Sequence, residues 1–205
     1  MFYKVDEPHG LARNPFKSLV APRPIGWISS QDVEGRLNLA PYSFFNAVAA
    51  DPPIVMFANN GAHSEGGAKD SVVNIESTKE FVCNLATWDT RESMNVSSAM
   101  VARDRDEFEM AGLTPIASKL VAPPRVKESP VHMECRYLQS LQLPSPDPNQ
   151  PNTVVFGQVL GIHIDESILT EGYVDIAKLK PIARLGYMDY CVVEDRFTMT
   201  RPKTE

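Results

Sequence analysis

Residues 26–40 decide the fold class, and they read Gly26-Trp27-Ile28-Ser29-Ser30-Gln31-Asp32-Val33-Glu34-Gly35-Arg36-Leu37-Asn38-Leu39-Ala40. Two short runs, 26–30 and 36–40, have the composition of strands. Between them, the segment 32–35 combines Asp with Gly, which is typical of a tight turn. This arrangement predicts a β-hairpin.

Four further segments predict strands, because they are apolar or rich in β-branched residues. They are residues 54–58, 81–85, 132–138 and 153–164. The first of these is a continuous apolar run, which indicates a strand covered on both faces. With the hairpin, the sequence therefore predicts six strands.

The helical segments are fewer and shorter. Helices are predicted at residues 68–76, 91–101 and 104–111. The stretch 144–151 contains four prolines and predicts a loop. Because strands and helices do not alternate regularly, these elements favour a β-rich α+β fold with an antiparallel barrel over a doubly wound sheet.

Composition limits the class of protein further. The chain has 205 residues, of which 43% are hydrophobic and 22% charged, so we expect a single domain over residues 1–205. A net charge of −6 argues against a nucleic-acid or anionic-membrane partner. No stretch approaches the ~18 apolar residues of a membrane span. We therefore expect a soluble cytoplasmic protein, in which Cys83, Cys135 and Cys191 are reduced thiols.

The residues suggest no metal site and no catalytic side chain. His132 and Cys135 have a spacing that places them on opposite faces of a strand, so they do not form a ligand pair. The chain also lacks the Gly-x-Ser-x-Gly motif of serine hydrolases. We therefore name no catalytic and no metal-binding residue.

A glycine-containing stretch, residues 61–67, precedes the helix predicted at 68–76. It lacks the Gly-Lys-Ser/Thr ending of a nucleotide triphosphate loop. Lys69 and Ser71 nevertheless stand at the helix start, where backbone N–H groups and the helix dipole favour an anion. The alternative is that Asp70 or Ser71 only caps the helix and that Lys69 is solvated.

Residues 21–30 and 40–47 contain the densest group of aromatic, arginine, hydroxyl and amide side chains. Such a group could form the walls around a planar heteroaromatic ligand and hydrogen-bond to its edge. The alternative is an aromatic core beneath proline-containing corners.

At these residues the sequence resembles the flavin reductase-like family of FMN-binding split-barrel proteins, in its flavoredoxin-like branch. The resemblance covers nearly the whole chain and rests on motifs that occur in order. They lie at residues 23–30, 38–46, 51–57, 69–75, 106–114, 128–132, 155–157 and 183–186.

The resemblance implies a six-stranded antiparallel Greek-key split β-barrel with a few short flanking helices, which forms a homodimer. It also implies an FMN cofactor, with FAD as a possible substitute, bound near the dimer interface. The implied cofactor-binding residues fall into three groups. Ser43, Phe45 and Asn46 would border the flavin ring and the ribityl chain, Arg23, Trp27 and Ser29 would lie along the same cleft, and Lys69 and Ser71 would hold the phosphate. Arg184 would be a further contact near the flavin.

The implied function is that of an FMN-binding oxidoreductase, which reduces flavin with NAD(P)H or relays electrons through bound FMN to a redox partner or monooxygenase. No general base is needed, because the flavin ring carries the chemistry. The sequence departs from the resemblance at residues 149–152, which read Asn-Gln-Pro-Asn where related reductases often carry a Gly-Asp-His motif associated with the nicotinamide. Two alternatives remain open, a non-catalytic flavin or haem carrier or sensor and a pyridoxamine-phosphate oxidase-like FMN enzyme.

Overall fold

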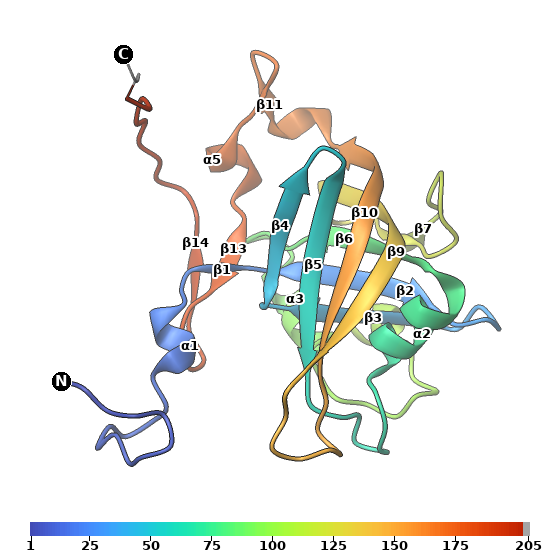
Figure 1. The fold of residues 1–205 in the computed structure, drawn as a ribbon. Coiled ribbons are helices and arrows are strands. Elements are labelled where there is room, and N and C mark those ends of the chain that lie inside the picture. The colour runs from blue at the N-terminus through green and yellow to red at the C-terminus, as the bar shows by residue number, and fades with distance from the viewer. Residues whose placement is uncertain (203–205) are drawn as a thin grey trace.

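An antiparallel sheet of seven strands forms the centre of the computed structural model, which describes residues 1–202 (Figure 1). Its strand order is β3-β2-β6-β9-β10-β5-β4. These strands are β2 (Gly26–Gln31), β3 (Leu37–Tyr42), β4 (Phe45–Ala50), β5 (Pro53–Asn60), β6 (Glu80–Leu85), β9 (Val131–Leu143) and β10 (Asn152–Ile164).

The remaining elements are short. The helices are α1 (Phe16–Leu19), α2 (Asp70–Thr78), α3 (Arg91–Val96), α4 (Glu107–Met110), η1 (Glu166–Ile168) and α5 (Ile176–Leu179). The other strands are β1 (Arg23–Pro24), β7 (Pro115–Ile116), β8 (Arg125–Val126), β11 (Leu169–Thr170), β12 (Tyr173–Val174), β13 (Ile182–Arg184) and β14 (Tyr190–Val192). No helix within residues 1–202 is long and apolar enough to cross a membrane.

The predicted hairpin is present. Strands β2 and β3 pair with Gly26 opposite Tyr42 and Gln31 opposite Leu37. The other four predicted strands correspond to β5, β6, β9 and β10, and residues 144–151 connect the last two as a loop. The β-rich α+β fold class is therefore confirmed.

The strand count differs from the expected six, because residues 45–50 form an additional edge strand, β4. These residues are small and rich in alanine, and alanine is depleted in strands, so composition gives no strand signal there. The sheet also remains open, since no described strand pairing joins its two edge strands, β3 and β4. The sheet is nevertheless curved, so that its β3 edge approaches β5. The ring centroids of Tyr42, on β3, and Phe57, on β5, lie 4.7 Å apart.

The apolar run of β5 indicated a strand that is covered on both faces. In the structure only one face of β5 is buried. Val55, Phe57 and Asn59 are buried, whereas the residues between them are partly exposed. Side chains alternate across a strand, so only one set of β5 side chains faces the core. An apolar run therefore overstated how far this strand is covered.

Two apolar clusters stabilise the sheet. The first lies within the curved sheet and contains Ile28, Phe57 and Phe81. The second contains Trp27 and Met94 and lies between β2, α3 and α4. The site described below lies beside α2, at the β3 edge of the sheet.

Helix α3 is shorter than predicted and ends at Val96. Beyond it, the hydroxyls of Ser97 and Ser98 donate hydrogen bonds to the carbonyls of Met94 (2.8 Å) and Asn95 (2.6 Å). Such side-chain bonds compete with helix continuation. Residues 97–101 consequently leave the helix and become available as a cavity wall.

A small sheet, β1-β13-β14, lies outside the seven-stranded sheet near α1, and the segments before α1 and after β14, as far as residue 202, extend away on this side (Figure 1). Its register places Arg23 directly opposite Arg184, although the two residues are 161 positions apart in the numbering. This sheet brings the ends of the chain to the same region as the β3–β4 turn.

Candidate functional site

A cavity of about 100 Å³ opens where three segments meet. One wall is residues 38–42 of β3, the second contains His63 and residues 69–71 at the start of α2, and the third is residues 97–101. Ligand pockets for whole cofactors usually enclose about 300–1,000 Å³. This cavity is therefore large enough only for part of a ligand such as FMN.

Lys69 is the most informative residue in this cavity. It is half-buried, burial lowers the pKa of its ammonium group, and it forms no ion pair within residues 1–202. It is also the N-cap residue of α2, and no side chain caps the helix there. A desolvated cation beside uncapped N–H groups is suited to bind an anion.

The two carboxylates that line the cavity are already satisfied by other groups. Asp70 forms an ion pair with Arg103. Glu107 accepts hydrogen bonds from the side-chain amide of Asn38 (3.0 Å) and from the backbone N–H of Leu39 (3.1 Å). Burial raises the pKa of Glu107. Neither group neutralises Lys69.

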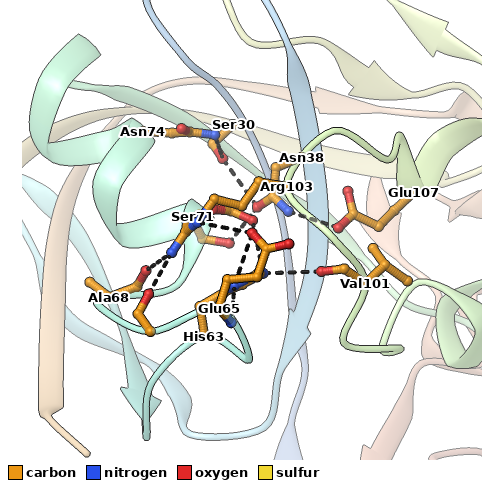
Figure 2. Close-up of polar contacts among 12 residues, drawn as sticks. Ser30, Asn38, His63, Glu65, Ala68, Ser71, Asn74, Val101, Arg103 and Glu107 are labelled. Carbon is orange, nitrogen blue, oxygen red and sulfur yellow. Dashed lines mark hydrogen bonds and ion pairs between the residues drawn. The ribbon is translucent and has the colours of Figure 1, made fainter. Parts of the chain in front are cut away.

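Figure 2 shows how Asn38 organises this wall of the cavity. Its side-chain oxygen accepts a hydrogen bond of 2.7 Å from the Ser71 hydroxyl, while its amide donates to Glu107. Asn74, one turn further along α2, donates to the hydroxyl of Ser30 over 3.3 Å. The network joins α2, β2, β3 and α4, so the start of α2 is held firmly against the sheet.

The loop before α2 is held by a second group of contacts, also visible in Figure 2. Arg103 donates to the carbonyls of Gly66 (2.9 Å) and Ala68 (3.1 Å) in addition to its contact with Asp70. The ring of His63 lies 3.0 Å from the carbonyl oxygen of Val101. These contacts set the position of Lys69 relative to residues 97–101.

Arg23, Ser43 and Arg184 form a second predicted group, outside the cavity. Burial and the nearby charge of Arg184 lower the pKa of Arg23, whose Nε lies 3.5 Å from the Ser43 hydroxyl. The Arg23 guanidinium otherwise donates to backbone carbonyls of Lys17, Val20 and Leu185. Within residues 1–202, neither Arg23 nor Arg184 has a carboxylate partner. Two neighbouring cations without a counter-ion favour negative charge next to them.

Phe45 and Asn46 lie at the start of β4, with only Phe44 between them and Ser43. A Cβ atom added to Gly26 would lie only 2.4 Å from the ring of Phe45, so the glycine permits this ring to pack on β2. Asn46 is exposed and its side-chain oxygen accepts the N–H of Ala47 (2.9 Å). The β3–β4 turn thus presents polar groups at an exposed edge of the sheet.

Trp27 and Ser29 lie in the interior, and this corrects the expectation that they line the cleft. Both are fully buried. The Trp27 indole N–H donates to the Ser97 hydroxyl (2.9 Å), and the Ser29 hydroxyl donates to the carbonyl of Pro124 (2.5 Å). They point into the core because successive side chains of β2 are covered on both faces. Trp27 supports the cavity only indirectly, through Ser97.

The predicted residues thus fall into two groups, with Lys69 and Ser71 at the cavity and Arg23, Ser43 and Arg184 near the β3–β4 turn. Residues 41–42 line the cavity and continue directly into Ser43. Sequence reasoning missed Asn38 and Glu107 as members of the site. The available signal was that each is a polar residue next to apolar ones, Asn38 between Leu37 and Leu39 in β3 and Glu107 before Phe108 in α4.

The flavin reductase-like domain family matches residues 19–183, which is most of the chain. The chain belongs to this family. An uncharacterized protein of Aquifex aeolicus is 40% identical to it over 169 residues, which cover 82% of this chain and 83% of that protein. The family expected from the sequence motifs is therefore confirmed.

Three solved structures agree with this chain in fold. Nitrilotriacetate monooxygenase component B of Bacillus cereus is 29% identical, with a TM-score of 0.85 over 97% of this chain and 99% of that one. The 2-nitrobenzoate 2-nitroreductase NbaA of Pseudomonas fluorescens is also 29% identical, with a TM-score of 0.78 over 91% and 88%. Flavoredoxin of Desulfovibrio vulgaris, at 18% identity and a TM-score of 0.74 over 97% of each chain, shares the fold. Family and neighbours together support flavin binding and an oxidoreductase role.

Proposed function

We propose that this protein is an FMN-binding oxidoreductase, in which residues 1–205 form one flavin-binding domain in the cytoplasm. The observation that carries the proposal is the half-buried ammonium group of Lys69 at the uncapped start of α2, which forms no ion pair within residues 1–202. FMN has a terminal phosphate that this group would bind, and charge-assisted hydrogen bonds to phosphate are among the strong ones. FAD, which also contains a phosphate at this position, is the alternative flavin.

The size of the cavity supports a divided site. A volume of about 100 Å³ accommodates the phosphate end, and the flavin ring would lie outside, along Ser43, Phe45 and Asn46. Arg23 and Arg184, which lack carboxylate partners within the described chain, would stabilise negative charge on the ring. When bound, the flavin supplies the electron-transfer chemistry, and these residues bind, orient and tune it.

An exposed ring site requires cover, and we propose that a second copy of the chain provides it. Residues 46–50 of β4 are all exposed, and four of these five residues are Ala or Val. A free apolar edge strand is a site for association, which proteins otherwise block with charged residues. β4 carries no such charge, so a homodimer through this edge would also enclose the ring.

The proposed electron donor and acceptor rest on the flavin reductase-like family and on the solved structures that resemble this chain. NAD(P)H would reduce the flavin, and a monooxygenase or another redox partner would receive the electrons, as the likeness to nitrilotriacetate monooxygenase component B supports. Anaerobic rapid mixing with NADH and NADPH tests the donor, because reduction bleaches flavin absorbance. If neither nucleotide bleaches the flavin, the electrons come from a protein partner.

The decisive experiment compares FMN with riboflavin, which lacks the phosphate. We expect Lys69→Ala to weaken FMN binding about 10–100-fold, the loss of one charged hydrogen bond, and to leave riboflavin binding unchanged. The readout is quenching of flavin fluorescence. Lys127→Ala removes the same charge from an exposed position and is the control. Equal loss of both flavins in Lys69→Ala would contradict the phosphate role, and no flavin binding by the wild-type protein would end the proposal.

A further inference from the structure

A second cavity, of about 340 Å³, lies between α3 and the β13–β14 pair. Met94 and Ile182, which are almost fully buried, form an apolar floor that belongs to the second core cluster. Nothing in the proposed phosphate site uses this cavity. Its volume falls within the range of about 300–1,000 Å³ that is usual for small-molecule sites.

The walls of this cavity pair aromatic rings with guanidinium groups. The Arg91 guanidinium carbon lies 3.8 Å from the centroid of the Trp88 ring. On the other side, the Arg184 guanidinium carbon lies 4.4 Å from the centroid of the Tyr190 ring. Arg91 also donates to the carbonyl oxygen of Trp88 (2.6 Å). Cation–π contacts of this kind hold the guanidinium planes in place, and each guanidinium has further N–H donors that a ligand could use. The cavity is therefore bounded by planar surfaces with donors at their edges.

The charge of the cavity is positive. Arg91 has one carboxylate neighbour, Glu92, at 3.4 Å, but the Glu92 side chain is 81% exposed and contributes little. Arg184 donates to the Tyr190 hydroxyl and the Tyr187 carbonyl, which are both neutral. A ligand carboxylate could thus contact either arginine without displacing a buried ion pair.

We propose that this cavity binds a planar aromatic carboxylate. The apolar floor and the aromatic walls favour a flat ring over an aliphatic one, and the arginines favour a carboxylate over a neutral substituent. Arg184 also lies opposite Arg23, so the bound ring would lie next to the proposed flavin-ring region. The proposal concerns binding alone and does not depend on a bound flavin.

The experiment uses flavin-free protein and benzoate, with tryptophan fluorescence as the readout. The chain has two tryptophans, of which Trp27 is fully buried and Trp88 is 44% exposed at the cavity. We expect benzoate to produce a saturable change that is absent in Trp88→Phe. Benzyl alcohol, which keeps the ring without the charge, and cyclohexanecarboxylate, which keeps the charge without the flat ring, should each bind about tenfold more weakly.

Arg91→Gln provides the residue-level test, with calorimetry as a second readout. We expect it to weaken benzoate binding about tenfold and to leave benzyl alcohol unchanged. Arg136→Gln, which removes an exposed arginine of β9, should leave both unchanged. The proposal is overturned if benzoate shows no saturable binding, if the three compounds bind equally, or if Arg91→Gln and Arg136→Gln behave alike. FMN titration of the same samples tests the proposed function separately.

Discussion

The hydroxyl of Ser71 donates a hydrogen bond of 2.7 Å to the side-chain oxygen of Asn38, and this bond ties the first turn of α2 to β3. Both residues are buried, at 1% and 7% exposure. Because its hydrogen is committed to Asn38, we expect the Ser71 hydroxyl to support the proposed phosphate site mainly by fixing the helix start. Lys69 has no such partner within residues 1–202 and would carry the charge interaction.

Ser71→Ala should consequently affect stability more than phosphate recognition. We expect a loss of about 1–2 kcal/mol in the free energy of unfolding, since a buried hydrogen bond is removed. The preference for FMN over riboflavin should fall much less than in Lys69→Ala. Urea unfolding and flavin titration measure the two effects. Ser77→Ala, on a more exposed face of the same helix, is the control, and the prediction is wrong if both serine variants lose equal stability.

The preference for FMN should depend on pH through Lys69. Burial lowers the pKa of this ammonium group, so it loses its proton at a lower pH than an exposed lysine. As pH rises through that pKa, the charge disappears, and FMN binding should approach riboflavin binding. The ratio of the two dissociation constants cancels ionisation of the shared flavin ring and is measured from pH 7 to 10.

Lys69→Arg is the matched variant for this pH dependence, because arginine keeps its charge throughout that range. We expect its FMN preference to persist at pH 10. A wild-type ratio that stays constant up to pH 10 would contradict the assignment, as would an equal decline in the two proteins.

The exposed edge of β4 predicts the effect of a charge at Val48, which is 49% exposed. Val48→Asp should convert a dimer into a monomer, because a carboxylate would be buried without a partner at the interface. Light scattering coupled to gel filtration measures the mass. Val33→Asp, in the β2–β3 turn and 78% exposed, should leave the mass unchanged. If the wild-type protein is a monomer, the proposed dimer through β4 is wrong.

We expect Glu134 to make the stability of the fold sensitive to acid. Burial of this carboxyl raises its pKa, but hydrogen bonds from the N–H groups of Lys119 (2.8 Å) and Leu120 (2.5 Å) and from His163 outweigh burial, so the pKa is lowered overall. A carboxyl with a lowered pKa stabilises the fold above its unfolded-state pKa, and this stabilisation is lost as pH falls through the folded-state pKa.

Glu134→Gln should therefore be less stable than the wild type at pH 7, by about 2 kcal/mol, because the new amide places a donor against backbone N–H donors. The difference should shrink as pH falls below about 4.5, the usual range for this carboxyl. Urea unfolding at pH 7 and at pH 3.5 measures it. A difference that is equal at the two pH values would contradict the lowered pKa of Glu134 in the folded protein.

Six strands could be predicted because their residues combine β-branched and apolar side chains within short runs that end at turn residues. β4 could not, because half of Phe45–Ala50 is alanine and the segment becomes a strand only by pairing with β5. The predicted helix at 91–101 extends beyond the observed end of α3 at Val96. The helix ends there because the hydroxyls of Ser97 and Ser98 bond to carbonyls three residues earlier, and the apolar pattern of the segment does not show these bonds.

The sequence by itself determined the family, the β-rich fold class and the place of Lys69 at a helix start, because each depends on local pattern. Only the tertiary structure decided which of these residues meet. Arg23 and Arg184 become neighbours through the β1–β13 pairing, whereas Trp27 turns into the core despite lying within the same motif as Arg23. Strand register and the side to which each residue points are collective properties of the sheet, and a one-residue change in either would exchange buried residues for exposed ones.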